Sequence, residues 1–257
     1  MKKLILSLLC ASVSALAAQP APSAPSVLIV ADEFPAMEIL AGKLRASENI
    51  ESKIVKQTEM PKDLAAFRAV IVYIHGDMRA PAEKAFINYT QAGGKLILLH
   101  HSISSGKRKN QLWIPFTAVN LPYGEFKDGG YHWIDPVTLD IVNLAPLHYI
   151  TTHNVKFPLS ITYNSSTLGG GERKYPGFTL PETEVYLNHV LTGERTVLLG
   201  LKYKEAATGR TYMQDTAGWV QPSGKGCIVY LMAGHSVKEF EHPIYLQLVL
   251  NAVTFKP

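Results

Sequence analysis

Histidine is the residue type whose placement in this chain most clearly suggests chemistry. Two adjacent imidazoles, His100 and His101, follow the apolar run at 96–99 in the stretch GGKLILLHHS. His235 follows a second apolar run in the stretch GCIVYLMAGHS. Ligands of an open parallel sheet bind beyond the carboxyl ends of its strands. The pattern therefore predicts that His100 and His235 share one crevice at the rim of a sheet.

Imidazoles and carboxylates placed together can exchange protons with a substrate or hold a divalent metal ion. We predict His100 and His235 as base and acid, Glu184 as the group that orients one of them, and His132 as a further catalytic residue. Whether a metal such as zinc is bound is left open; His100, His132 and His235 are the candidate ligands. The chain has no HExxH or CxxC spacing, so the sequence signal for a metal is weak.

Four further residues are predicted to contact the substrate: His101, Tyr123, Trp133 and Asp215. Successive residues of a strand point to opposite faces, so the rings of His100 and His101 are expected to diverge. One ring would then face the crevice while the other packs beneath it. The aromatic rings of Tyr123 and Trp133 could stack on a sugar ring, although packing within a loop explains them equally well.

Three other reactive side chains are interpreted as structural. His75 follows a strand in the stretch VYIHGD, but a lone histidine is more often a packed residue than a ligand. Ser102 lacks the GxSxG frame of a nucleophile elbow. Cys227 begins an apolar strand, where a small core residue is expected.

Alternating strand and helix signals fill the first half of the chain. Short apolar or β-branched runs predict strands at 27–31, 52–56, 70–74 and 96–99, and helical spacing predicts helices at 36–45 and 80–92. This alternation is typical of a mostly parallel sheet covered on both faces. The segment 106–177 is rich in Gly, Pro, Asn and Ser, so we expect it to be irregular. Further strands, some in hairpins, are expected at 184–190, 196–203, 212–220 and 227–232, before a closing helix at 243–253.

The first 18 residues have the pattern of a secretory signal peptide. Lys2 and Lys3 precede an apolar run that ends in Ala-Leu-Ala, and cleavage is expected after Ala17 or Ala18. A short linker at 19–26 and a single domain at 27–257 would follow. The sequence therefore predicts a periplasmic or secreted bacterial protein without a stable membrane anchor after cleavage.

Composition narrows the possible partners. A chain of 257 residues with 47% hydrophobic and only 18% charged residues can bury a substantial core. The formal charge of +4 falls to +2 without the two signal-peptide lysines, and no basic run is interleaved with aromatics. Nucleic acid is therefore not an expected partner.

Without its signal peptide the chain keeps one cysteine, Cys227, which excludes an intramolecular disulfide.

Five stretches of the chain together resemble the ThuA-like (trehalose utilisation) family. They are AGGKLILLHHS, FKDGGYHW, PETEVYLNHVL, AGWVQPSGKGCIVYLMAGHS and HPIYLQLVLNAV, within residues 27–253. The resemblance implies a three-layer α/β/α fold, flavodoxin-like and similar to class I glutamine amidotransferases, with a mostly parallel central sheet and additional strands in the C-terminal third. It also implies a role in carbohydrate metabolism.

Individual positions match or depart from that family pattern. Its histidine after a glycine-led strand matches His100, and its glycine-histidine matches His235. Its Asp/Glu-Glu-x-Tyr element resembles Glu184 and Tyr186, with Thr183 departing from the acidic first position. Members often carry a histidine soon after the first strand, where this chain has Ala-Asp-Glu at 31–33. If that histidine takes part in the family's chemistry, either Asp32 or Glu33 substitutes for it or this chain has lost the activity. The amidotransferase relatives place a nucleophilic cysteine where this chain has His100, which excludes thiolate-dependent glutamine hydrolysis.

Two functions follow from these observations. The first is an exported enzyme that acts on a small-molecule sugar or keto-glycoside by hydrolysis or elimination. The alternative is a non-catalytic sugar-binding or scaffolding module with the same fold. A hydrolase that uses Ser102 is the weakest of the enzymatic hypotheses, because the sequence around this serine lacks the expected motif.

Overall fold

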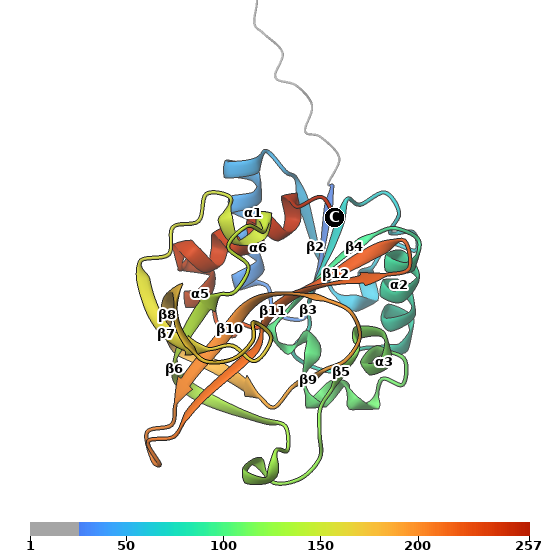
Figure 1. Ribbon diagram of the computed structural model, residues 1–257. Coiled ribbons are helices and arrows are strands. Elements are labelled where there is room, and N and C mark those ends of the chain that lie inside the picture. Colours follow the sequence, from blue (N-terminus) through green and yellow to red (C-terminus); the bar gives the residue numbers. More distant parts are fainter. Residues whose placement is uncertain (1–25) are drawn as a thin grey trace, which may run out of the picture.

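A ten-stranded mixed sheet runs through the computed structural model, which describes residues 26–257 (Figure 1). The strand order is β2-β1-β3-β4-β12-β11-β10-β6-β8-β7. A separate two-stranded sheet pairs β5 (Val119–Asn120) with β9 (Val190–Leu191). The predicted signal peptide at 1–18, and the linker apart from its last residue, lie outside the described residues.

Five strands form the parallel half of the large sheet: β2 (Ser52–Val55), β1 (Val27–Ala31), β3 (Ala69–Tyr73), β4 (Lys95–Leu99) and β12 (Gly226–Leu231). Every residue of β1, β3 and β4 is buried. Continuous apolar runs form such strands because both of their faces are covered. The elements predicted for this half of the sheet are confirmed, with small shifts at their ends.

Helices lie on either side of the parallel strands (Figure 1). On one side, α1 (Pro35–Glu48), α5 (Val237–Glu241) and α6 (Pro243–Thr254) contact one another, and α4 (Tyr149–Thr152) contacts α6. On the other side, α2 (Ala80–Gln91) contacts β4, β12 and α3 (Trp113–Thr117). Short 3-10 helices span Gln57–Glu59, His100–Ile103, Ser105–Lys109 and Phe126–Asp128. None of the helices within residues 26–257 is both long and apolar enough to cross a membrane.

The other five strands of the large sheet are antiparallel to their neighbours. They are β11 (Thr211–Ser223), β10 (Thr196–Lys204), β6 (His132–Asn143), β8 (Glu172–Leu187) and β7 (Leu159–Asn164). Four neighbouring pairs of the sheet are parallel and five are antiparallel. The prediction of a mostly parallel sheet is therefore wrong, and the flavodoxin-like three-layer arrangement does not describe the sheet as a whole.

The error arose in the segment 106–177, which contains β6, β7 and the start of β8 instead of being irregular. Pro136 and the glycines around β8 resemble turn residues in the sequence. In the structure, the register between β6 and β8 shifts between Ile134 and Val137, which places Pro136 in a bulge. A proline is tolerated at such a position because no ladder hydrogen bond is needed from it.

The carboxyl ends of three neighbouring parallel strands meet at one rim of the sheet. His75 lies two residues after β3, His100 directly after β4, and His235 four residues after β12. The strands that precede His100 and His235 are neighbours, because β12 pairs with β4 and Leu231 lies opposite Leu99.

Candidate active site

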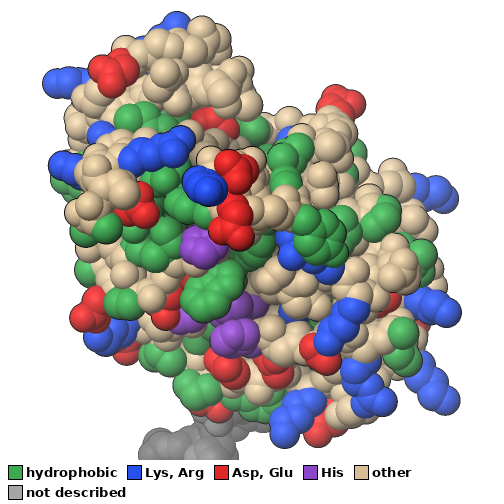
Figure 2. Space-filling model, turned by 90° about the horizontal axis from the view of Figure 1, so that it is seen from below, with side chains coloured by type: hydrophobic (Ala, Val, Ile, Leu, Met, Phe, Trp, Pro, Cys, Tyr) green, Lys and Arg blue, Asp and Glu red, His purple; other side chains and the backbone are tan. Residues whose placement is uncertain are grey.

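Four side chains converge at this rim: His100, His101, Glu184 and His235. Oε2 of Glu184 lies 2.7 Å from Nε2 of His100, 3.2 Å from Nε2 of His101 and 3.1 Å from Nδ1 of His235. Nε2 of His100 is also 3.2 Å from Nδ1 of His235. Three imidazoles thus share one carboxylate oxygen, and we call these four residues the His/Glu cluster. Figure 2 shows histidine, acidic and apolar side chains gathered in the middle of one face of the molecule.

The backbone at His100 turns both adjacent imidazoles toward Glu184. Strand β4 ends at Leu99, and His100 begins a 3-10 helix with a left-handed φ of 45°. Strand alternation therefore no longer applies, and the rings of His100 and His101 lie 4.1 Å apart at 87°. The predicted divergence of the two rings is wrong for this reason. A non-glycine residue in this conformation costs about 1–2 kcal/mol, and such strain is often found at functional sites.

The surroundings of His100 fix its tautomer. Its Nδ1 lies 2.5 Å from the carbonyl oxygen of Met232. Because a carbonyl only accepts, Nδ1 carries a hydrogen, which in the neutral form of the ring leaves the lone pair at Nε2. Tyr186 stacks on the ring at 4.8 Å, and its hydroxyl lies 3.2 Å from the same Nε2. Burial raises the pKa of Tyr186 well above its usual value, so the hydroxyl keeps its proton.

Glu184 is ionised in this setting. Burial alone would raise the pKa of its carboxyl, but the close contacts with the imidazoles of His100, His101 and His235 outweigh burial and hold this pKa far below its usual range. Burial lowers the pKa of His101 to about 3, so His101 is neutral. The hydrogen bond to Glu184 raises the pKa of His235, whose side chain is 25% exposed.

Three further polar side chains surround the exposed edge of the His/Glu cluster. Oδ2 of Asp135 lies 3.7 Å from Nε2 of His235. The ring of His75 stacks on His101 at 3.6 Å and 13°, and its Nδ1 lies 3.2 Å from Oε1 of Glu33. We had interpreted His75 as a structural residue and had not singled out Asp135. The position of His75 after a strand that neighbours β4 was the signal that could have identified it.

Asp32 and Lys107 hold the turn that carries His75. The carboxylate of Asp32 accepts the backbone N–H groups of His75 at 2.8 Å and Gly76 at 2.6 Å. Nζ of the buried Lys107 donates to the carbonyl of Gly76 at 2.6 Å, and burial lowers the pKa of Lys107 to about 8. Asp32 and Glu33, the acidic pair that follows β1, therefore position His75. Glu33 contacts its ring, and Asp32 accepts its backbone N–H.

His132 and Trp133 lie side by side on β6 but face opposite ways. Trp133 pairs with Tyr186 across the ladder, so both side chains share one face of the sheet, next to His100. Trp133 is 53% exposed there. Alternation places His132 on the other face, where its ring stacks on Phe126 at 5.0 Å. The structure therefore does not bring His132 into the His/Glu cluster.

Two of the predicted substrate contacts lie elsewhere. Tyr123 is 82% exposed, with the guanidinium of Arg108 4.2 Å above its ring. Asp215 is buried, and its carboxylate accepts from Tyr163 Oη at 2.7 Å, Ser165 Oγ at 2.7 Å and the backbone N–H of Thr167 at 2.8 Å. These contacts hold the segment after β7 against strand β11, which carries Asp215.

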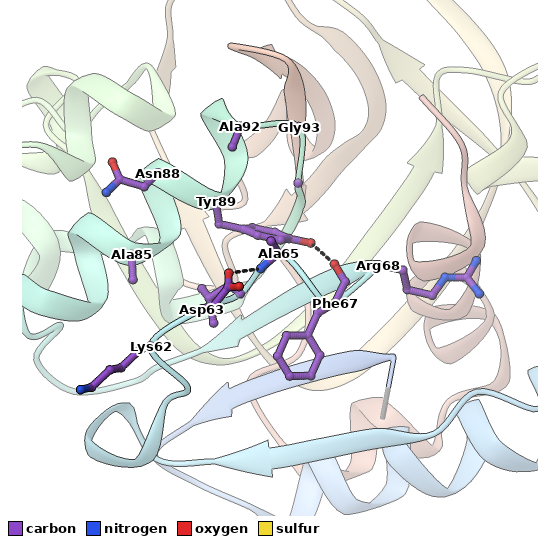
Figure 3. Close-up of a pocket in the computed structure, with 12 residues that line it drawn as sticks. Lys62, Asp63, Ala65, Phe67, Arg68, Ala85, Asn88, Tyr89, Ala92 and Gly93 are labelled. Atoms are coloured by element: carbon purple, nitrogen blue, oxygen red, sulfur yellow. Dashed lines mark hydrogen bonds between the residues drawn. The ribbon is translucent and has the colours of Figure 1, made fainter. Parts of the chain in front are cut away.

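A pocket of about 270 Å³ opens beside the cluster and is lined in part by Glu33, Tyr73 and His235. A larger pocket of about 490 Å³, shown in Figure 3, lies next to Gly93 and Gly94, before the start of β4. The five residues of β4 separate the two ends of the strand by roughly 16 Å. The larger pocket therefore lies at the opposite rim and contains no residue of the His/Glu cluster.

No protein-family model matches the chain, and no curated relative matches it in sequence. Among solved structures, a protein described as ThuA-like from Parabacteroides merdae ATCC 43184 has a TM-score of 0.61 and 15% identity, and the match covers 89% of each chain. A cytoplasmic protein from Salmonella typhimurium LT2 has a TM-score of 0.57 and 14% identity, with coverage of 89% of this chain and 98% of that chain. A β-galactosidase from Bacillus circulans sp. alkalophilus has a TM-score of 0.52 and 11% identity, with coverage of 89% of this chain and 30% of the enzyme. The resemblance to ThuA-like proteins is thus confirmed at the level of the fold.

Proposed function

We propose that this protein is an enzyme of carbohydrate metabolism that acts on a sugar or keto-glycoside at the His/Glu cluster. The observation that carries the proposal is the convergence of three imidazoles on one buried, ionised carboxylate, Glu184, beside an open pocket. Structural likeness to a ThuA-like protein and to a β-galactosidase supports carbohydrate as the substrate class.

Elimination from a keto-glycoside suits this arrangement. A base removes the proton from the carbon next to the ketone, negative charge develops on the ketone oxygen, and the bond to the aglycone oxygen then breaks as that oxygen takes up a proton. The N–H of His235, the most exposed imidazole of the His/Glu cluster, would donate to the oxygen on which this charge develops. Asp135 and His75, which lie at the exposed edge of the cluster, would exchange the two protons, with Glu33 orienting His75. Hydrolysis would use the same groups, with water as the nucleophile.

Trp133 supports a sugar ring as the bound group. Its ring is half-exposed and shares a sheet face with Tyr186, which contacts His100. An aromatic face at the mouth of a site is a common platform for the apolar face of a sugar. The N-terminal pattern adds the proposal that the enzyme is exported before it meets its substrate.

The test is turnover by the purified protein of a panel of 3-keto-glycosides and their parent glycosides, with products identified by mass spectrometry. Product formation by the wild-type chain that is lost in Glu184→Gln would support the proposal. If no member of the panel is converted but calorimetry detects sugar binding, the protein is a non-catalytic binding module instead.

A further inference from the structure

We propose that His100, His101, His235 and Glu184 bind one divalent first-row transition-metal ion of the zinc type. The ligand atoms would be Nε2 of His100, Nε2 of His101, Nδ1 of His235 and Oε2 of Glu184, which lie within 4.8 Å of one another. The inference rests on the proposed function for the ion's role, which would be to polarise a ketone oxygen. The binding itself needs no substrate and can be tested alone.

Four of the six distances among these atoms are close to those of a coordination shell, and all four atoms lie within 4.8 Å of one another. Their contacts measure 2.7, 3.1, 3.2 and 3.2 Å. In a tetrahedral zinc site with bonds of 2.0–2.1 Å, neighbouring ligand atoms lie about 3.3 Å apart. A hydrogen-bond network explains the same geometry poorly, because three imidazole nitrogens crowd onto a single oxygen of Glu184, which has two lone pairs.

The protons of His100 give an independent reason. Its Nδ1–H is committed to the carbonyl of Met232, so the neutral ring presents a lone pair at Nε2. That lone pair faces the anionic Oε2 of Glu184 at 2.7 Å, in a place from which solvent is excluded. Two lone pairs at this distance repel each other unless a proton or a metal ion lies between them. A metal ion accepts both lone pairs.

Groups around the cluster match the outer shell of a metal site. A metal-bound histidine usually donates its other N–H to a backbone carbonyl or a carboxylate, which fixes the ring. His100 has such a partner in the Met232 carbonyl, and His235 has Asp135 beside its Nε2. His100 is fully buried whereas His235 is partly exposed, so the ion would be reached from the side of His235.

The donor set also indicates the class of ion. Three neutral nitrogens and one carboxylate oxygen suit Zn²⁺, Co²⁺, Ni²⁺ or Fe²⁺. Ca²⁺ and Mg²⁺ prefer shells of oxygen atoms, which this cluster does not provide.

The test is metal binding by the chain without its predicted signal peptide (residues 19–257), after bound metal has been removed with a chelator. Titration with Zn²⁺ or Co²⁺ alone should give about one ion per chain, and Co²⁺ should produce visible absorption. In His235→Ala, which removes the most exposed ligand, and in Glu184→Gln, the affinity should fall by at least roughly 100-fold. His153→Ala, which removes an exposed histidine outside the cluster, should bind as the wild type does.

Circular dichroism would establish that each variant is folded, and His235→Gln would replace His235→Ala if the latter unfolds. A wild-type chain that binds neither ion stoichiometrically would overturn the inference, as would unchanged affinity in folded Glu184→Gln and His235 variants. Metal binding without turnover of any sugar would contradict only the proposed function. Turnover that is unaffected by complete metal removal would contradict the role assigned to the ion, while the titration decides whether the ion binds.

Discussion

Nε2 of His100 lies 2.7 Å from Oε2 of Glu184, although four strands separate β4 from β8 in the order of the sheet. In a flat sheet, five steps between neighbouring strands would span about 24 Å. The antiparallel half must therefore curl back over the carboxyl rim of the parallel half. Register shifts in β10 and between β6 and β8 are the bulges at which such bending occurs.

Replacing Glu184 should abolish most of the activity. Glu184→Gln removes the carboxylate that three imidazoles share, so kcat/KM on a keto-glycoside is expected to fall by about 100- to 1,000-fold. The matched control is Glu182→Gln, two residues away, where the side chain is exposed and pairs only with Lys238. That control should keep the kcat/KM of the wild type, because its exposed ion pair lies outside the cluster. Activity of Glu184→Gln close to that of the wild type would rule out the cluster as the reaction centre.

Trp133 should contribute to substrate binding more than to the chemical step. Trp133→Ala is expected to raise KM about 5-fold with little change in kcat, since stacking on an aromatic face contributes roughly 1 kcal/mol. Steady-state kinetics with Leu147→Ala as control would test this, because Leu147 is an exposed apolar residue near α4. A fall in kcat at unchanged KM would contradict the assigned role.

Gly234 should be intolerant of a side chain. Its φ is +115°, and a Cβ there would lie 2.5 Å from Oη of Tyr245. Gly234→Ala is therefore expected to lower the free energy of unfolding by about 2–3 kcal/mol and to displace the adjacent His235. The control is Gly42→Ala in α1, where a Cβ meets nothing within 4 Å and helix propensity predicts stabilisation of up to about 1 kcal/mol. Urea denaturation of both variants would measure the difference, and equal stability of the two would contradict the argument.

Asp215 should stabilise the fold in a pH-dependent way. Burial opposes its ionisation, but hydrogen bonds from Tyr163, Thr167 and Ser165 lower the pKa of its carboxyl below the usual value. The stabilisation is then complete above the unfolded-state pKa of about 3.9 and is lost as the pH falls through the lower folded-state pKa. We expect Asp215→Asn to cost about 2 kcal/mol at pH 7 and less in acid. A difference in unfolding free energy that grows toward low pH would show that the sign is wrong.

The N-terminal pattern can be tested by expression of the full chain in a bacterial host. We expect the protein recovered from the periplasm to begin just after Ala17 or Ala18, since this is the predicted cleavage site. Intact mass and N-terminal sequencing would measure it. Recovery of an uncleaved chain from the cytoplasm would contradict the predicted export.

Much of the parallel half could be predicted from local pattern. The predicted strand at 27–31 has the observed bounds of β1, because a strand buried on both faces is a continuous apolar run. Proline and glycine mark helix ends clearly, as at α2, where Pro81 lies in the first turn and Gly93 follows the last. The antiparallel strands β6 and β7 were missed because half-exposed strands with a proline and many polar residues resemble loops.

The placement of individual side chains depended on register. His132 and Trp133 are neighbours in the sequence, yet only Trp133 shares a face with Tyr186, because pairing with β8 fixes which residues face the cluster. A shift of one residue would have reversed their positions, and nothing in the local sequence specifies that pairing.

The sequence by itself determined that His75, His100 and His235 each follow the end of an apolar strand. Short apolar runs encode the length and burial of such strands. Only the tertiary structure decided that Glu184 meets them, that His100 adopts a left-handed backbone, and that His75 joins the group while His132 does not. The physical reason is that strand formation depends on neighbours along the chain. Sheet curvature, bulges and register depend instead on pairing between segments that are far apart in sequence.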